Sequence, residues 1–180
     1  MEFDLQPTLT GESLILRPLR PDDLEALWAV ARDPLLWAQH PDQTRHTREG
    51  FERFFAAALA GGALAVVDRR SGRVIGSTRY YERDAQRREV AVGYTFLARE
   101  FWGGRANREM KRLLIEHAAP HADAIWFHVG SQNLRSRRAM EKLGAEAAFE
   151  GQRPQNGEMV DFIYYRIAPA RWLARGAGGA

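Results

Sequence analysis

Two segments of this sequence combine residue types that suit the binding of a phosphorylated cosubstrate. They are Thr95–Asn107 (TFLAREFWGGRAN) and Asn133–Gly144 (NLRSRRAMEKLG), and each lies between a predicted strand and a predicted helix. Paired glycines allow a ligand to approach the backbone closely, and the free N–H groups of the next helix stabilise a phosphate. In the second segment, Asn133 and Ser136 are three residues apart and face nearly the same side of a helix.

The elements that must position these segments follow from the hydrophobic periodicity. Helices are expected from Pro21 to just before Pro34 and over 47–60, 107–118 and 134–143, with a last helical turn over 168–175. Strands are expected over 13–19, 63–68, 74–82, 89–97, 124–129, 147–150 and 159–167.

Three consecutive strands with short connections favour antiparallel pairing, whereas the two later β–α–β units require crossovers. The order therefore predicts an α+β (mixed α/β) fold with a mixed, mostly antiparallel sheet and helices on both faces. We expect a single domain over residues 1–175 and a disordered tail over 176–180.

The composition favours a soluble globular protein. Of 180 residues, 45% are hydrophobic and 27% charged, and the absence of cysteine excludes disulfides and a Cys nucleophile. No histidine pair has metal-ligand spacing, so no metal is expected. The acidic N-terminus lacks the pattern of a signal peptide and no apolar run is long enough to span a membrane, which predicts a cytoplasmic protein without a membrane partner.

The charge is carried almost entirely by arginine. The net charge is +3, and lysine occurs only at 111 and 142, so 24 of the 26 basic residues are arginine. Most arginines alternate with acidic residues, which argues against a nucleic-acid surface. Clusters at Arg87-Arg88 and at Arg135 with Arg137-Arg138 are the exceptions.

The two segments together resemble the GNAT superfamily of acetyl-CoA-dependent N-acetyltransferases. The family's phosphate loop reads roughly Gln/Arg-x-x-Gly-x-Gly/Ala, and its second motif reads Asn-x-x-Ser-x-x-x-x-x-Lys-x-Gly. Phe101-Trp102 before the glycines is similar to the branch that contains the ribosomal-protein N-terminal acetyltransferases. The resemblance runs from about Ser13 to Ile167. It implies the GNAT fold, in which the fourth and fifth predicted strands splay apart to admit the pantetheine arm of acetyl-CoA.

The resemblance also implies which residues bind acetyl-CoA. The loop departs from the family pattern at Trp102, Arg105 and Asn107, but backbone donors do not depend on side-chain identity. Phe96 and Leu97 would present backbone groups to the pantetheine amides, and Asn133 would hydrogen-bond the same arm. The full set of implied cofactor-binding residues is Phe96, Leu97, Trp102, Gly103, Gly104, Arg105, Ala106, Asn107, Asn133, Ser136, Arg138 and Lys142, the last two for the 3′-phosphate.

For catalysis, the resemblance implies direct attack by a primary amine on the thioester. Many relatives carry a glutamate base two residues before the Gly-aromatic pair, where this chain has Ala91. Glu89 lies two residues further back and could act through water, or could be an exposed carboxylate paired with a neighbouring arginine. Ser136 could protonate the departing thiolate, which needs modest help because thiols have a pKa near 8.5.

The acceptor and the partners are less determined by the sequence. Trp37, Tyr80 and Tyr81 are candidates for the acceptor pocket, and His128 is expected to be a packed strand histidine. The amine could belong to a protein N-terminus or to a small molecule. A monomer or a homodimer is expected. The alternative is an acyl-CoA-binding sensor or partner module with little or no transferase activity, which Ala91 would favour.

Overall fold

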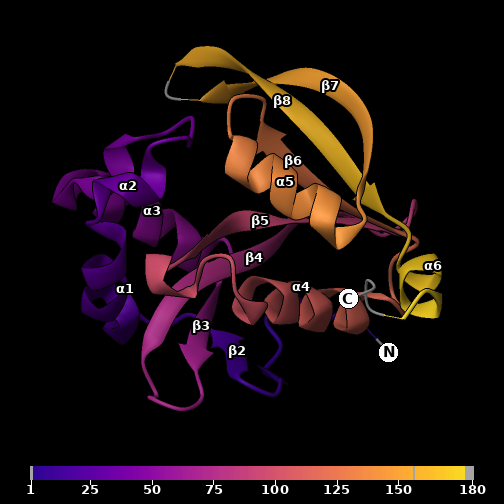
Figure 1. The fold of residues 1–180 in the computed structure, drawn as a ribbon, viewed down its shortest axis with the longest axis horizontal. Helices are drawn as coiled ribbons and strands as arrows, with labels where there is room; N and C mark the ends of the chain where they lie inside the picture. Colours follow the sequence, from indigo (N-terminus) through magenta and orange to yellow (C-terminus); the bar gives the residue numbers. More distant parts are fainter. Residues whose placement is uncertain (1, 156, 177–180) are drawn as a thin grey trace.

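The computed structural model describes residues 2–155 and 157–176, which form one mixed eight-stranded sheet with helices on both faces (Figure 1). The tail expected to be disordered, 176–180, lies outside the described residues except for Gly176. The strands are β1 (Leu9–Thr10), β2 (Leu14–Pro18), β3 (Leu64–Asp68), β4 (Val74–Asp84), β5 (Glu89–Leu97), β6 (Ala124–Gly130), β7 (Glu146–Gln155) and β8 (Glu158–Ile167).

The helices are α1 (Leu24–Ala31), α2 (Pro34–Trp37), α3 (Arg48–Ala60), α4 (Arg105–Ala118), α5 (Leu134–Leu143) and α6 (Pro169–Ala174). Short 3₁₀ helices lie at Pro21–Asp23, Thr44–His46 and Arg99–Phe101. Helix ends follow the expected chemistry. Thr47 caps α3 by accepting from the N–H of Gly50, and Gly144 ends α5 with a φ of 78°, a left-handed conformation that glycine adopts without strain.

The strand order is β1-β2-β3-β4-β5-β6-β8-β7, and the neighbours are antiparallel except for β5 and β6. This arrangement confirms the mixed, mostly antiparallel sheet expected from the sequence. The parallel pair is joined through α4, a crossover of the kind that parallel strands require.

Two hydrophobic clusters lie on opposite faces of the sheet. The apolar stripe of α4, which includes Met110 and Leu114, packs with α5 residues such as Met140 on one face. On the other face, α1 and α3 pack Leu27, Phe51 and neighbouring side chains against the sheet. This packing holds α4, which follows β5, and α5, which follows β6, against the sheet.

Candidate functional site: the cleft between β5 and β6

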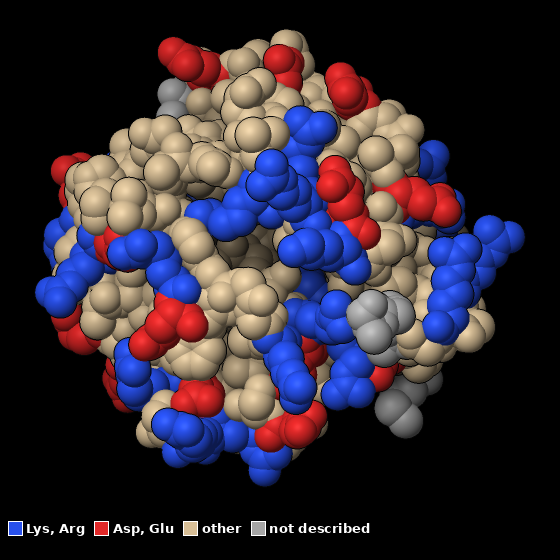
Figure 2. Space-filling view, viewed as in Figure 1, with Lys and Arg blue, Asp and Glu red and all other residues tan. Residues whose placement is uncertain are grey.

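A cleft opens where the two parallel strands separate. β5 and β6 pair only through Glu89 with Ala124, Val90 with Ile125 and Ala91 with Trp126. Beyond these pairs the strands diverge around a cavity of about 440 Å³, which the amino ends of α4 and α5 also border. Figure 2 shows this face of the molecule hollowed near its centre, with Lys and Arg side chains beside the hollow. The splay implied by the family resemblance is therefore present.

The loop before α4 forms one end of the cleft. Gly103 has a φ of 68°, and no atom lies within 4 Å of the position where a Cβ would stand. Gly104 is the N-cap of α4, and the Trp102 indole N–H donates to the Leu97 carbonyl at 2.9 Å, which holds the loop against β5. A diphosphate could approach the free N–H groups here, so the residues present fit that part of CoA.

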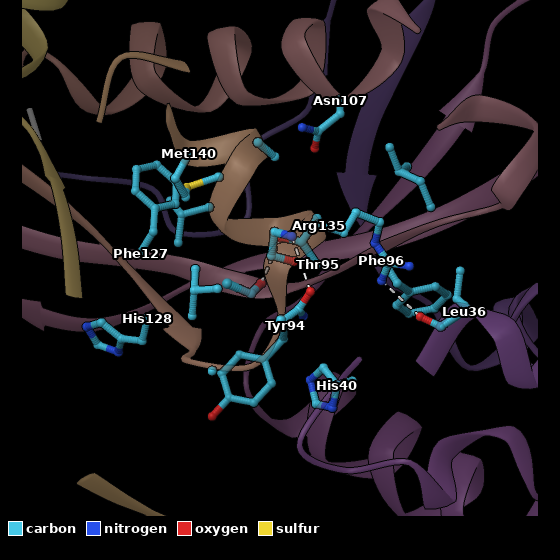
Figure 3. Close-up of a pocket in the computed structure, with 18 of the residues that line it drawn as sticks. Leu36, His40, Tyr94, Thr95, Phe96, Asn107, Phe127, His128, Arg135 and Met140 are labelled. Atoms are coloured by element: carbon cyan, nitrogen blue, oxygen red, sulfur yellow. Dashed lines mark hydrogen bonds between the residues drawn. The ribbon is translucent and has the colours of Figure 1, made fainter. Parts of the chain in front are cut away.

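The predicted loop residues differ in their side-chain positions. Trp102, Gly103 and Asn107 line the cleft, and Asn107 projects into it from α4 (Figure 3). Arg105 is exposed, whereas the Ala106 side chain is buried against the main core. Ala106 can therefore contribute only its backbone.

The amino end of α5 forms the opposite wall. Asn133 is buried, and its Oδ1 accepts from the N–H of Ser136 at 3.1 Å, so it caps the helix as well as lining the cleft. Ser136 also lines the cleft. Arg138 and Lys142 are exposed on α5 and do not line the cleft, which restricts them to the outer part of a bound cosubstrate.

A break in the pairing of β4 and β5 shapes the inner wall. Ser77 is opposite Phe96 and Arg79 is opposite Gly93, so two residues of β5 face one residue of β4. Tyr94, one of the two, has a φ of 51°, which is unusual for a residue with a side chain. The bulge turns the β5 backbone toward the cleft, where Thr95, Phe96 and Leu97 also line it.

Arg135 is a site residue that the sequence marked only as part of an arginine cluster. Its guanidinium lies 3.8 Å from the centre of the Trp102 ring and donates to the Leu36 carbonyl at 3.0 Å (Figure 3). Its backbone N–H donates to Gln39 Oε1 at 3.0 Å. The Arg135 side chain thus connects α5 with the phosphate-loop tryptophan and with α2, and its backbone N–H adds the segment after α2.

One of the predicted acceptor residues lies away from the cleft. Tyr80 is 2% exposed, and its hydroxyl donates to the Leu114 carbonyl at 2.6 Å in the main core, so its assignment to the acceptor pocket was wrong. Side chains alternate along a strand, and the next residue, Tyr81, faces the cleft side instead, where its hydroxyl contacts His128 Nδ1 at 2.8 Å. Trp37 does line the cleft, with its indole N–H donated to the Ala31 carbonyl.

Glu89 was also misplaced as a candidate base. It is the first residue of β5, opposite Asp84 and Ala124, whereas the cleft begins at Val92, about 10 Å further along the strand. Among the described residues that line the cleft there is no aspartate or glutamate. The arrangement therefore offers no carboxylate in direct reach of an amine bound there.

The two cleft histidines are neutral at neutral pH. Burial, together with the charge of Arg153, lowers the pKa of His128 to about 4, and burial with Arg45 lowers that of His40 to about 3. His128 lines the cleft, which the sequence did not show, and its Nδ1 contacts the Tyr81 hydroxyl and the Arg153 guanidinium. Tyr81 and Arg153 thus hold the His128 ring in place at the edge of the cleft.

Other classes of site are not indicated in the described part of the chain. No group of three or more His, Cys, Asp or Glu side chains there could hold a metal ion. None of its helices has the length and apolar character needed to cross a membrane.

Comparison with known proteins agrees with this geometry. Residues 13–146 match the family model described as an acetyltransferase (GNAT) domain. The chain belongs to the GNAT acetyltransferase family. A comparison with curated proteins finds no match.

Solved structures of other GNAT proteins share the fold. A GCN5-related N-acetyltransferase from Brucella melitensis superposes with a TM-score of 0.85 at 18% identity, over 96% of this chain and 83% of that one. A GNAT-family acetyltransferase from Bacillus anthracis gives 0.74 at 18% identity, over 91% and 99%. A spermidine N-acetyltransferase from Vibrio cholerae, solved with CoA and spermine, gives 0.70 at 16% identity, over 91% and 99%. GNAT acetyltransferases use acetyl-CoA, and family membership supports acetyl transfer in general.

Proposed function

We propose that this protein transfers an acetyl group from acetyl-CoA to the α-amine of a peptide N-terminus. The observation that carries the choice of amine is the cleft itself, whose described lining residues include no carboxylate. An amine must lose its proton before it attacks, because an ammonium ion has no lone pair.

The pKa of the acceptor decides how much help it needs. At pH 7.5, about a quarter of an α-amine with a pKa near 8 is neutral, but only about a thousandth of an alkylamine with a pKa near 10.4. A site without a carboxylate base is therefore better matched to α-amines. Positioning the neutral amine against the thioester supplies much of the remaining rate enhancement.

The charges beside the cleft point the same way. Arg45 and Arg79 border a smaller cavity that shares Tyr94 with the main cleft, and Arg153 contacts His128. Arg45 is buried over the Phe54 ring, and the Arg79 guanidinium lies 3.7 Å from the centre of the Tyr94 ring. Arg45 and Arg153 are paired with Asp42 and Glu82. Arg79 has no ion pair among the described residues, so it is the cation here that would oppose a polyamine, although one structural neighbour is a spermidine acetyltransferase.

The roles of the chain's own residues follow from their positions. The N–H groups at the start of α4 would hold the diphosphate, and the backbone after the β5 bulge would hold the pantetheine arm. Ser136 would supply a proton to the departing thiolate. This assignment agrees with the resemblance to the branch that acetylates ribosomal-protein N-termini, which itself remains a proposal. We further propose a cytoplasmic location, in keeping with that substrate class.

A thiol-release assay tests the proposal. Purified protein with acetyl-CoA is offered peptides that begin with Ala or Ser, free amino acids, polyamines and aminoglycosides at equal concentrations. We expect turnover with α-amines and at least tenfold less with polyamines. A parallel thermal-shift measurement reports acetyl-CoA binding. A clear shift without turnover on any amine would favour an acyl-CoA-binding module, and faster turnover of polyamines would contradict the choice of α-amines.

Arg135 gives a separate prediction for cosubstrate binding. Lysine keeps the charge but lacks the planar group that lies against Trp102, so Arg135→Lys is expected to raise KM for acetyl-CoA about 3- to 10-fold with little change in kcat. Steady-state kinetics with the best acceptor measures both constants. Arg171→Lys, an exposed position on α6, is the matched control. An unchanged KM with a reduced kcat would show that Arg135 acts elsewhere.

A further inference from the structure

Lys111 is a buried cation at the floor of the cleft. It lies on α4, is 4% exposed, and lines the cavity between β5 and β6. Its Nζ donates to Thr95 Oγ1 on β5 at 3.1 Å and lies 5.0 Å from the centre of the Phe127 ring on β6. β5 and β6 stop pairing at Ala91 and Trp126. The Lys111 amine lies beyond that point, between Thr95 of β5 and Phe127 of β6.

The charge of this amine is not compensated by the protein. Lys111 forms no ion pair within the described residues, and burial is the only cause that lowers the pKa of its ammonium to about 7. Thr95 Oγ1, its hydrogen-bond partner, also contacts Thr78 Oγ1 at 2.8 Å. An ammonium has three N–H donors, so at least two of them lack a protein acceptor here.

An anion is the group that this position lacks. A buried cation costs less when a carboxylate shares the site and accepts its hydrogen bonds. The cleft presents no acidic side chain among the described residues that line it, so the anion would have to come from a ligand. Most of the remaining lining near the amine is apolar or aromatic, including Val92, Phe127 and Met140, which would shield such a pair from water.

We propose that the cleft accepts an acyl-CoA whose acyl group ends in a carboxylate, and that Lys111 pairs with that carboxylate. The inference rests on the proposed function, since the thioester must reach the gap between β5 and β6. The arm would run from the loop at Gly103 along Leu97 and Phe96, which places the acyl end near Thr95. Figure 3 shows Thr95 and Phe127 among the residues around this part of the cleft.

The transfer itself is unchanged by the extra carboxylate. The acceptor nitrogen bonds to the thioester carbonyl carbon, the carbon–sulfur bond breaks, and the thiolate gains the proton that the amine gives up. The terminal carboxylate stays on the acyl group throughout. Lys111 would select the donor and would not take part in bond changes.

Equilibrium binding of CoA, acetyl-CoA and succinyl-CoA tests the proposal without knowledge of the acceptor. We expect the wild type to bind succinyl-CoA about tenfold or more tightly than acetyl-CoA. Lys111→Met, which keeps the length without the charge, is expected to abolish or reverse that preference. Arg112→Met removes a charge from the exposed side of the same helix, where Arg112 pairs with Glu116, and is expected to keep it.

The preference should also depend on pH. Pairing needs the protonated amine, so the advantage of succinyl-CoA is expected to be full below pH 7 and to fall as the pH rises above it. The other titratable or charged groups that face the cleft are His40, Tyr94, His128 and Arg135, and the two histidines are already neutral in this range. The same titration on Lys111→Met should show no such fall.

Several outcomes would overturn the inference. Equal or tighter binding of acetyl-CoA by the wild type would do so while leaving the proposed function intact. An equal loss of affinity for all three ligands in Lys111→Met would place Lys111 on the CoA phosphates instead. A gain in protein mass at Lys111 after incubation with either acyl-CoA would make the lysine itself an acceptor. If CoA did not bind at all, the proposed function would be contradicted as well.

Discussion

Lys111→Met is expected to increase the free energy of unfolding at pH 7 by about 2 to 4 kcal/mol, because a buried charge without a partner is replaced by an apolar side chain of similar length. The wild-type ammonium is fully hydrated when the chain is unfolded. In the folded chain it keeps one hydrogen bond, to Thr95. Methionine fits an apolar gap readily because it is flexible.

The gain should depend on pH in a defined direction. The folded pKa of Lys111 is about 7, below the ordinary 10.5, so folding disfavours the protonated form. The wild type therefore carries the full penalty only well below pH 7. Its stability is expected to recover by about 1.4 kcal/mol per pH unit from pH 7 toward the unfolded pKa. The advantage of Lys111→Met should shrink over the same range.

Denaturant unfolding of the wild type, Lys111→Met and Arg112→Met across this pH range measures the effect. Arg112→Met removes an exposed charge that pairs with Glu116 at 3.7 Å, and should change stability by only a few tenths of a kcal/mol. A difference between wild type and Lys111→Met that stays constant with pH would contradict the assignment of the penalty to a buried ammonium. A less stable Lys111→Met would contradict it more strongly.

A residue that reduces stability while lining the cleft is most easily understood through function. Natural proteins depart from the rules of stable packing mainly at sites where binding or catalysis needs it. The binding experiment therefore measures what Lys111 contributes to acyl-CoA affinity, and the unfolding experiment measures what it costs in stability. A stabilising Lys111→Met that also loses succinyl-CoA preference would link the stability cost to donor selection.

Much of the fold could be predicted because its signals are local. The predicted ranges of β3, β5 and α5 agree with those observed to within one residue. Short connections correctly indicated antiparallel neighbours. The splayed strands came from the family resemblance, since no local pattern in β5 shows where its pairing with β6 ends.

Other parts depended on long-range contacts that the sequence does not display. β7 was expected over 147–150 but extends over Glu146–Gln155, because its backbone pairs with β8 even though its side chains are mostly exposed. The Tyr80 assignment failed because two adjacent tyrosines face opposite sides of the sheet. Glu89 failed because its distance from the cleft depends on where the strands separate.

Lys111 itself carried a signal that periodicity could have supplied. It lies three residues before Leu114 and seven before Ala118, both buried, so it falls on the inward stripe of α4. A lysine at such a position must either reach solvent or be buried at a cost. Only the structure shows that it is buried beside Thr95.

Glu109→Ala is expected to lower the free energy of unfolding by about 1–3 kcal/mol. Glu109 is buried on α4 and accepts hydrogen bonds from the backbone N–H groups of Ser13, at 2.8 Å, and Leu14, at 3.2 Å, and from the Ser13 hydroxyl. Alanine would leave the buried Leu14 N–H without its acceptor, which costs about 1–3 kcal/mol, whereas Ser13 is exposed and its donors can turn to water. Glu109→Gln keeps one acceptor oxygen and should lose less.

The stability lost in Glu109→Ala should be seen at neutral pH and should disappear in acid. Burial raises the pKa of Glu109, but the hydrogen bonds from Ser13 and Leu14 outweigh it and hold the pKa below the ordinary 4.5. The wild-type contribution is thus present above the unfolded pKa and is lost as the pH falls through the folded one. Wild type and Glu109→Ala should converge in stability on acidification. Glu116→Ala, at an exposed position on the same helix, is the control.

The same substitution tests whether α4 must be fixed to present its amino end to the cosubstrate. Glu109 ties α4 to β2 one turn after the N–H groups that would hold the diphosphate. If this tie positions the loop, Glu109→Ala should weaken CoA affinity at temperatures where the variant is still folded, and Glu109→Gln should restore part of it. Unchanged affinity in a clearly destabilised variant would mean that the Trp102 to Leu97 hydrogen bond alone holds the loop in place.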